Sequence, residues 1–134
     1  MLVPVASRSL IGRKRISQTP DLFDYPLLSA KTRSDEWPNW FANQREKLPN
    51  EQRYIIYDSI ALVIDAAIAG VGIALVDKLL IKDDIRRKLL RVLIDKPLKG
   101  LNAYYVVTQT VKTPDPKTIL FRNWLISEFA RDTE

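Results

Sequence analysis

Tyr54-Ile-Ile-Tyr57 opens the stretch that decides the fold, and it continues through Asp58-Ser59, an apolar run from Ile60 to Ala69, Gly70 and Ile73-Ala-Leu-Val76. The first four residues have strand composition, and the two polar residues after them can cap a helix. The glycine ends that helix, and the next apolar residues do not alternate with polar ones, which indicates a strand covered on both faces. Strand, capped helix, turn and strand in this order predict a βαβ crossover.

Outward from this unit, strands and helices continue to alternate, which predicts the α/β class with a mostly parallel sheet. Pro4 cannot donate a hydrogen bond to a neighbouring strand, so the first strand is expected at a sheet edge or at the end of its pairing. The expected strands are Leu2–Ala6, Leu27–Ala30, Leu89–Ile94 and Ala103–Thr108, and the expected helices begin near Thr19, Ser34, Ile81 and Thr113.

Two of these helices carry aromatic stripes. Trp37, Trp40 and Phe41 lie three and four residues apart, so one helix face bears three large rings that are expected in the core. The two terminal strands, Leu2–Ala6 and Ala103–Thr108, are too few to make an independent layer under the last helix, so this part is expected to belong to something larger. The buried stripe of that helix, which runs to about Ala130, is expected to comprise Leu120, Phe121, Trp124, Leu125 and Phe129.

Composition excludes most enzyme chemistry. The 134 residues contain no cysteine and no histidine, so disulfides, thiolate or imidazole metal ligands, a cysteine nucleophile and a histidine base are all ruled out. Gly70 and Gly72 do not complete a dinucleotide fingerprint because position 75 is Leu. Asp83 and Asp84 are adjacent on a helix, so their carboxylates diverge and do not form an acid–base pair. We therefore expect no enzyme, no cofactor and no metal.

The net charge of +5, from 21 Lys and Arg against 16 Asp and Glu, favours a polyanion partner only where the cations cluster. The two basic groups, Arg8–Arg15 and Lys82–Arg91, lack the interleaved aromatic residues of single-strand binders, so both are expected to be solvated surface. The apolar stretch 60–75 is too short for a membrane span, and Met1 is not followed by a signal peptide. A cytoplasmic protein without membrane contact is expected.

Several stretches together resemble the effector-binding domain of LysR-type transcriptional regulators, in the branch of the glycine-cleavage activators and β-lactamase regulators. The resemblance is concentrated from Tyr57 onward and covers nearly the whole chain. The stretches that carry it are Leu2–Val5, Thr19–Leu22, Pro26–Leu28, Tyr57–Ser59, Ala66–Gly70, Gly72–Val76, Leu79–Leu80, Asp83–Asp84, Leu89–Arg91, Pro97–Leu98, Ala103–Val107 and Phe121–Leu125.

The resemblance implies a periplasmic-binding-protein-like fold of type 2, with a complete second lobe at about 7–102 and a partial first lobe. Residues 1–6 and 103–134 would supply the crossing strands and the remnant of that first lobe. The family's DNA-binding helix-turn-helix is expected to be absent from residues 1–134. A truncated gene, a natural short product and a cloned piece all fit this expectation.

The resemblance also implies a small-molecule site in a cleft outside the carboxyl ends of the strands. The free N–H groups at the start of the helix after Tyr57 suit a carboxylate or another anion. Ile60 stands where this branch has a hydroxyl, and Tyr104 matches a tyrosine that lines the cleft of the β-lactamase regulators. The candidate effector-binding residues are Lys31, Thr32, Arg33, Asp58, Ser59, Ile60 and Tyr104.

Each candidate residue also has a purely structural interpretation. Ser59 and Asp58 can be helix caps, and Tyr104 can be a packing residue between strands. Lys31 and Arg33 can be solvated loop charges. Asp65, in the middle of an apolar helix, can face a partner subunit or the rest of the first lobe.

The leading functional hypothesis is the ligand-sensing and oligomerisation portion of a LysR-type regulator. Its expected partners are a small, anionic effector and further copies of the chain, with DNA bound only through the helix-turn-helix. With one complete wall of the cleft, we expect this chain to bind effector poorly or not at all. The alternative is a stand-alone interaction protein that self-associates or modulates an intact regulator. Direct nucleic-acid binding and catalysis follow as weaker hypotheses.

Overall fold

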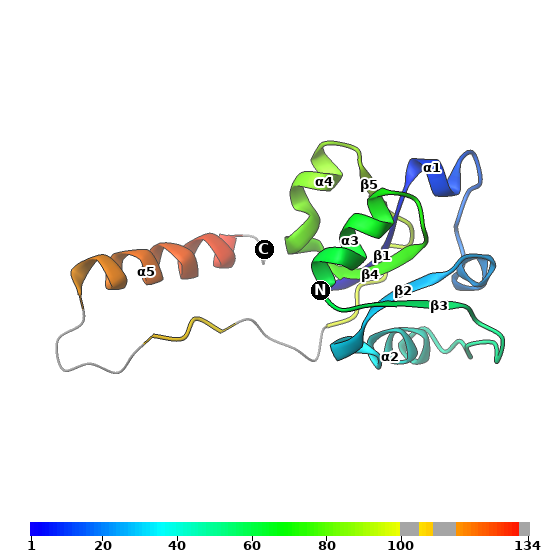
Figure 1. The fold of residues 1–134 in the computed structure, drawn as a ribbon, viewed down its shortest axis with the longest axis horizontal. Coiled ribbons are helices and arrows are strands. Elements are labelled where there is room, and N and C mark those ends of the chain that lie inside the picture. Colours follow the sequence, from blue (N-terminus) through cyan, green and yellow to red (C-terminus); the bar gives the residue numbers. More distant parts are fainter. Residues whose placement is uncertain (100–104, 109–114, 132–134) are drawn as a thin grey trace. The chain divides into compact units, whose positions relative to one another are not determined.

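Five strands form one sheet in the first hundred residues of the computed structural model (Figure 1). Residues 1–99, 105–108 and 115–131 are described, and they divide between two compact units, Met1–Gly100 and Leu101–Glu134. The strands are β1 (Leu2–Ser7), β2 (Leu27–Ala30), β3 (Tyr54–Tyr57), β4 (Ile73–Asp77) and β5 (Leu90–Val92), and their order across the sheet is β3-β2-β4-β1-β5.

The strand directions confirm the α/β class. Strand β2 pairs in parallel with β3 on one side and with β4 on the other, whereas β1 pairs antiparallel with both β4 and β5. Four strands therefore run one way and β1 runs the other. The predicted crossover is present: β3 leads through helix α3 (Ile60–Ile68) to β4, and β2 lies between the two strands that the helix joins.

The position of β1 distinguishes the two placements expected from Pro4, a sheet edge or the end of the strand's pairing. The strand does not lie at an edge, because it lies between β4 and β5. The Pro4 carbonyl accepts from the Leu93 N–H at 2.9 Å, so in an antiparallel strand the missing Pro4 N–H faces the same side. On that side β5 ends at Val92, one residue before Leu93. The proline thus stands where the pairing ends, and no hydrogen bond to β4 is lost.

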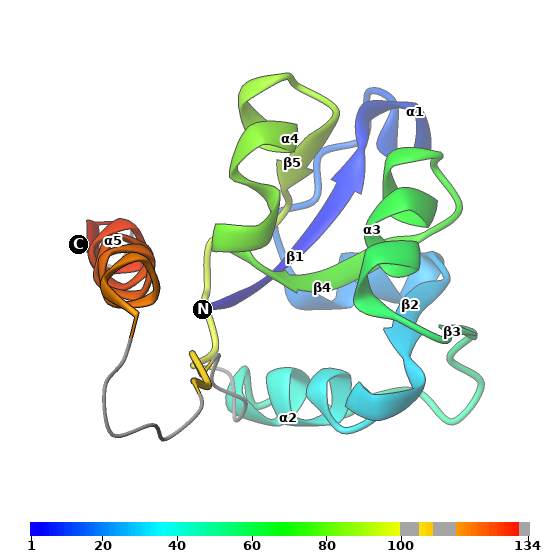
Figure 2. The ribbon, with the colours of Figure 1, turned by 60° about the vertical axis from the view of Figure 1, so that its left-hand side comes forward.

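Helices cover both faces of the sheet (Figure 2). Helix α2 (Glu36–Asn43) and the 3-10 helix η1 (Thr19–Asp24) cover one face. Helices α3 and α4 (Lys82–Arg86) cover the other. Each face has its own buried cluster, here named the α2-side cluster and the α3-side cluster. The α2-side cluster comprises Leu2, Ala6, Ile11, Leu22, Leu27, Trp37, Trp40, Phe41, Ile73, Leu75 and Ile94. The α3-side cluster comprises Val3, Val5, Leu28, Ala30, Val63, Ala66, Ala67, Ala74, Val76, Ile81 and Leu90.

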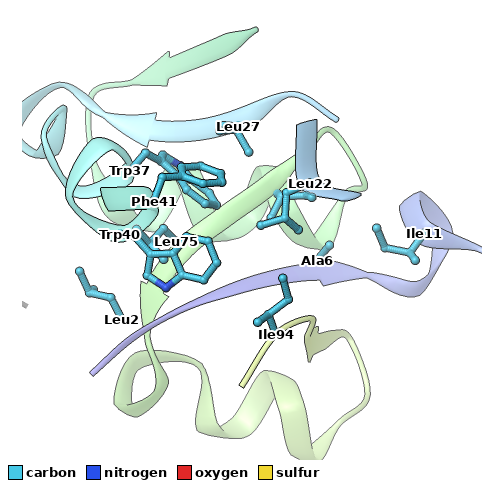
Figure 3. Packing of buried hydrophobic residues seen from close by; sticks show 11 residues of the cluster. Leu2, Ala6, Ile11, Leu22, Leu27, Trp37, Trp40, Phe41, Leu75 and Ile94 are labelled. Atoms are coloured by element: carbon cyan, nitrogen blue, oxygen red, sulfur yellow. The ribbon is translucent and has the colours of Figure 1, made fainter. Parts of the chain in front are cut away.

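The aromatic stripe of α2 fills the α2-side cluster, as predicted (Figure 3). Trp37, Trp40 and Phe41 are at most 1% exposed. The Trp37 and Phe41 rings stack with centroids 5.5 Å apart, and Trp40 meets Phe41 edge-on at 5.2 Å. The two indole N–H groups donate to backbone carbonyls, Trp37 to Leu28 at 2.9 Å and Trp40 to Lys96 at 3.1 Å. Large buried rings with satisfied polar atoms are strongly stabilising.

Short helices connect the strands and refine several predicted bounds. Helix α1 (Arg8–Ile11) follows β1, and η2 (Lys31–Arg33) and η3 (Lys78–Ile81) follow β2 and β4. The helix expected to begin near Ile81 is α4, which begins at Lys82 and ends at Arg86; two residues later, Lys88 has a positive φ of 61°. Thr19 does not cap η1. The Asp21 carboxylate instead accepts from the Ser17 and Gln18 N–H groups, both at 2.9 Å.

The second unit contradicts two predictions. Helix α5 (Pro116–Arg131) forms, but its stripe is not buried: Leu120 is 74% exposed, Phe121 61% and Trp124 55%. Phe129 is also exposed, and Leu125 is half-buried. Residues 105–108 do not form the expected strand, while Ala103 and Tyr104 lie outside the described residues. A strand forms only beside a hydrogen-bonding partner, and an apolar stripe is buried only where another apolar surface covers it. The periodicity of the sequence predicts neither of these neighbours.

Candidate ligand-binding site

The carboxyl ends of β2, β3 and β4 meet at one edge of the sheet. Ala30 ends β2 directly opposite Tyr57, which ends β3. Asp77 ends β4, the parallel neighbour on the other side of β2. Ligands of open α/β sheets bind outside such carboxyl ends, so this edge is the candidate site.

Two of the predicted residues pair directly at this edge. The Lys31 ammonium follows β2, the Asp58 carboxylate follows β3, and their Nζ and Oδ1 atoms lie 2.6 Å apart. Their side chains are 68% and 76% exposed. An exposed ion pair adds little to stability, because water screens it and two long side chains must be held in one geometry. Either group can therefore leave this ion pair and bind a ligand instead, at a low cost in free energy.

Ser59 begins α3, as the capping interpretation predicts. It has extended backbone, with φ −143° and ψ 159°, and its hydroxyl oxygen accepts from the Leu62 N–H at 3.4 Å. This bond satisfies one of the N–H groups that the first turn of a helix leaves without an internal partner. Asp58 precedes the cap, and its carboxylate is paired with Lys31 rather than with the helix.

The remaining predicted residues differ in their placement. Thr32 is exposed within η2. Ile60 is half-buried and packs against the α3-side cluster, so no polar contact comes from the position where the family branch has a hydroxyl. Asp65 is exposed on α3. Tyr104 lies outside the described residues, and its role stays a prediction.

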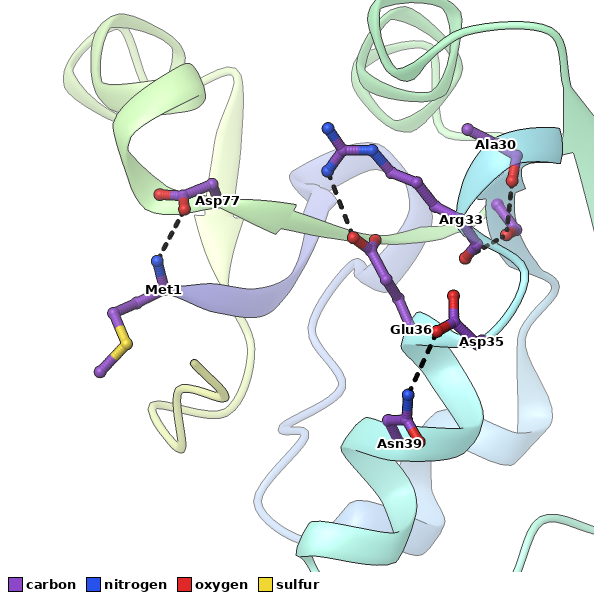
Figure 4. Close-up of polar contacts among 8 residues, drawn as sticks. Met1, Ala30, Arg33, Asp35, Glu36, Asn39 and Asp77 are labelled. Atoms are coloured by element: carbon purple, nitrogen blue, oxygen red, sulfur yellow. Dashed lines mark hydrogen bonds and ion pairs between the residues drawn. The ribbon is translucent and has the colours of Figure 1, made fainter. Parts of the chain in front are cut away.

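A buried ion pair that the sequence analysis missed lies just behind this edge (Figure 4). Arg33, in η2, donates from Nη1 to Oε1 of Glu36 at 3.2 Å, and the two side chains are only 18% and 9% exposed. The Ser29 hydroxyl donates to the Ala30 and Arg33 carbonyls at 3.3 and 3.4 Å, which ties η2 to the strand end. Arg33 was predicted to face the cleft; the structure shows its ion pair with Glu36, and its contact with a ligand stays a prediction. The i, i+3 spacing of opposite charges was the available signal.

The environment of Glu36 disfavours its charged form. Burial raises the pKa of the Glu36 carboxyl above its usual value, and the Arg33 guanidinium opposes that rise. The nearby carboxylates Asp35 and Asp77 add to the rise in the pKa. Asp77 is itself engaged: Oδ1 accepts from the Leu79 N–H at 3.0 Å, and Oδ2 lies 2.7 Å from the Met1 amine.

The edge offers a surface rather than an enclosed cavity. The hollow behind it, lined among others by Leu28, Arg33, Glu36 and Ile60, has no room for a water molecule. A ligand would therefore sit outside the strand ends, among charges of both signs. The first unit can contribute binding groups there.

A metal-binding cluster and a membrane-spanning helix are both absent from the part of the chain that the structure describes. In 1–99, 105–108 and 115–131, no group of three His, Cys, Asp or Glu side chains is placed to hold a metal ion. Within the same residues, no helix combines the length and the apolar composition needed to span a membrane.

Comparisons with known proteins agree with this architecture. The family model described as the LysR substrate binding domain matches residues 1–130. The glycine cleavage system transcriptional activator of Escherichia coli (strain K12) is 29% identical over 134 residues, which are 99% of this chain and 44% of that protein. Its homolog in Haemophilus influenzae (strain ATCC 51907 / DSM 11121 / KW20 / Rd) is 27% identical over 131 residues, 98% of this chain and 43% of that protein. The chain thus spans less than half the length of these curated relatives.

Solved structures show the same fold. The AmpR effector binding domain from Citrobacter freundii matches with a TM-score of 0.71 and 20% identity, covering 97% of this chain and 64% of that chain. The effector domain of the transcriptional regulator AmpR of Pseudomonas aeruginosa matches with a TM-score of 0.67 and 25% identity, covering 98% and 61%. The fold is therefore that of a periplasmic-binding-protein-like effector domain. The chain belongs to the LysR substrate binding domain family.

Proposed function

We propose that this chain forms one wall of the effector-binding cleft of a LysR-type transcriptional regulator and senses a small molecule that controls transcription. The observation that carries this proposal is the exposed Lys31–Asp58 pair, which lies beside the start of α3 at the carboxyl edge of the sheet. Membership of the family supports the proposal, because the curated relatives are transcriptional activators.

The proposed effector carries a carboxylate or another anionic group. Lys31 would exchange Asp58 for that group, and the N-terminal N–H groups of α3 would add a favourable dipole. The Asp58 carboxylate, once released, would be free to accept from a donor on the same molecule. The proposed contacts are Lys31, Thr32, Arg33, Asp58, Ser59, Ile60 and Tyr104, with Ile60 offering only apolar contact.

The proposed division of the chain follows the same fold. Residues of about 7–102 would form the second lobe, and residues 1–6 and 103–134 would belong to the crossing strands and the first lobe. On this proposal the apolar stripe of α5 is exposed because its packing surface belongs to the first lobe. Contact with DNA would be made by a helix-turn-helix that the matched residues do not include.

The proposal extends to the compartment, the assembly and the chemistry of the protein. A regulator of this kind would be cytoplasmic, would assemble as a homo-oligomer, and would bind its effector without catalysis or a cofactor. The absence of histidine and cysteine removes the commonest catalytic groups and supports the last point.

The effector site can be tested by titrating the ¹⁵N-labelled chain with a panel of small carboxylic acids and amino acids, followed by nuclear magnetic resonance. We expect weak binding, with amide shifts concentrated at 31–33 and 58–60. Lys31→Gln should remove these shifts, while Lys47→Gln, a change at an exposed lysine on another loop, should preserve them. Shifts that avoid both segments, or tight binding that Lys31→Gln does not weaken, would refute the proposed site.

A second candidate function is a stand-alone interaction protein that self-associates or modulates an intact regulator. The exposed apolar residues Leu120, Phe121 and Trp124 favour it, because large exposed apolar patches commonly mark protein interfaces. Sedimentation at increasing concentration separates the two candidates. Reversible association that Trp124→Glu abolishes would support this second function, and a monomer at high concentration would exclude it.

A further inference from the structure

A half-buried arginine on β5 forms no ion pair with a carboxylate among the residues that the structure describes. Arg91 lies opposite Ala6 across the β1–β5 pair, and opposed residues share one face of a sheet. Ala6 is fully buried in the α2-side cluster. The neighbours of Arg91 on its own strand, Leu90 and Val92, pack instead with the α3-side cluster. Arg91 thus places a permanent positive charge beside the buried α2-side cluster.

The guanidinium of Arg91 is only partly satisfied. Its Nη2 donates to the Lys14 carbonyl at 3.3 Å, whereas its Nε is shielded from water and lacks a hydrogen-bond partner. Among residues 1–99, 105–108 and 115–131, no carboxylate forms an ion pair with Arg91 or with Arg15. Desolvating a charge without a counter-charge costs free energy, so an anion at the accessible nitrogens would be stabilising.

A hollow beside Arg91 has the size and the lining for such an anion. Its volume is about 220 Å³, and Arg15, Ile16, Arg91, Val92 and Leu93 line it. Two of these five residues are arginines and none is acidic. Liquid water occupies roughly 30 Å³ per molecule, so the hollow has space for a group several times that size.

The backbone around the hollow adds a donor and holds the second arginine. Leu93 donates toward β1, so the alternation of an antiparallel strand turns the Val92 N–H outward, to the open edge of β5. The residue before Arg15 holds this segment in place. The Lys14 N–H donates to the Ile11 carbonyl at 3.1 Å, and the Lys14 ammonium lies 5.7 Å from the centre of the Tyr25 ring.

We propose that this hollow is a binding site for a small oxyanion, a phosphate or carboxylate group held between the guanidinium groups of Arg15 and Arg91. Arginine is suited to both groups, because its planar fork matches their oxygens in bidentate hydrogen bonds. The ligand can be free phosphate or a metabolite that carries either group.

The site is separate from the proposed effector site. Leu2 of β1 lies opposite Asp77 at the effector edge, and Ala6 of β1 lies opposite Arg91. Four residues of strand separate these positions, which is roughly 14 Å at about 3.4 Å per residue. A ligand here would act as a second signal on the same lobe, and the inference does not depend on the proposed function.

The test is a titration of the full 134-residue chain with inorganic phosphate, and separately with succinate, at an ionic strength held constant with sodium chloride. We expect saturable amide shifts at 15–16 and 91–93 and a rise in the midpoint of thermal unfolding with at least one of the two anions. Response to phosphate alone would identify phosphate-bearing ligands, and response to succinate alone would identify carboxylates.

Single-residue variants distinguish a specific anion site from nonspecific attraction of anions to a basic protein. Arg91→Gln and Arg15→Gln should each weaken binding by about tenfold, the loss expected for one charge-assisted pair. Arg15 is exposed, so its variant stays informative if Arg91→Gln fails to fold. Arg53→Gln, at an exposed arginine outside the hollow, should bind as the parent does. A response that is absent, unsaturable or equally reduced in Arg53→Gln would overturn the proposal.

Discussion

Helices α2 and α5 carry similar aromatic stripes and have opposite environments. Trp37 in α2 is 1% exposed and stacks on Phe41, whereas Trp124 in α5 is 55% exposed, although its ring also lies 5.8 Å from a neighbour, Phe121. In the first unit, five paired strands present a surface that accepts the stripe. In the second unit, the described residues consist of α5 and the non-strand segment 105–108. The difference shows that an amphipathic pattern specifies a face to be buried but not the surface that buries it.

The largest loss of stability should come from truncating a buried aromatic side chain of α2. We expect Trp37→Ala to lower the free energy of unfolding by about 3–5 kcal/mol, because it leaves a cavity and deprives the Leu28 carbonyl of its donor. Trp124→Ala should change it by less than about 0.5 kcal/mol, as is usual for exposed positions. Urea unfolding followed by circular dichroism measures both. Equal losses in the two variants would mean that α5 is packed on an apolar surface in solution.

The next largest effect concerns a close backbone approach at Gly72. A Cβ at Gly72 would meet the Pro26 carbonyl oxygen at 2.5 Å and the Leu28 side chain at 2.7 Å. Gly72→Ala should therefore cost about 1–3 kcal/mol through overpacking between the strand ends. Thermal unfolding followed by far-ultraviolet circular dichroism measures this loss. Ser127→Ala is the counterpart in α5 and should leave the transition unchanged. An unaffected Gly72→Ala protein would show that the two strands can separate freely.

A smaller effect is expected at the start of α3. Ser59→Ala removes the hydroxyl that accepts from the Leu62 N–H and should cost about 1 kcal/mol. Ser59→Asp keeps an acceptor and should recover most of that loss, as read from the midpoint of urea denaturation. If Ser59→Asp is as unstable as Ser59→Ala, the hydroxyl is not acting as a cap. In that case Ser59 would be retained for ligand contact alone.

The smallest effect is a dependence of stability on pH that originates in the first unit. Because burial raises the pKa of folded Glu36 above 4.5, its usual value, the unfolded chain ionises this group first as the pH increases. The contribution to stability is fully present below the unfolded pKa and is lost as the pH rises through the folded one. Urea midpoints measured between pH about 4 and 8 should fall less steeply in Glu36→Gln than in the parent. A steeper fall in the variant would reverse the sign and refute the assignment.

Those parts of the candidate site that depend on neighbouring residues in the sequence could be predicted. Ser59 was recognisable as a cap from its place between a strand and an apolar helix. The positions of Lys31 and Asp58, each directly after a parallel strand, placed both at the carboxyl edge. The ion pair between them was not predictable, because it depends on β2 and β3 being neighbours, and they are separated by the whole of α2.

The sequence by itself determined the α/β class, the β3–α3–β4 crossover and the burial of the α2 stripe, because periodicity and capping act within a few residues. Only the tertiary structure decided that β1 lies inside the sheet despite Pro4 and that Arg33 is held by Glu36. It also decided that Arg91 has no carboxylate partner within 1–99, 105–108 and 115–131, and that the α5 stripe is exposed. These features depend on which distant segments become neighbours. Pairing of that kind is determined by the free energy of the whole fold, and no local window of the chain contains it.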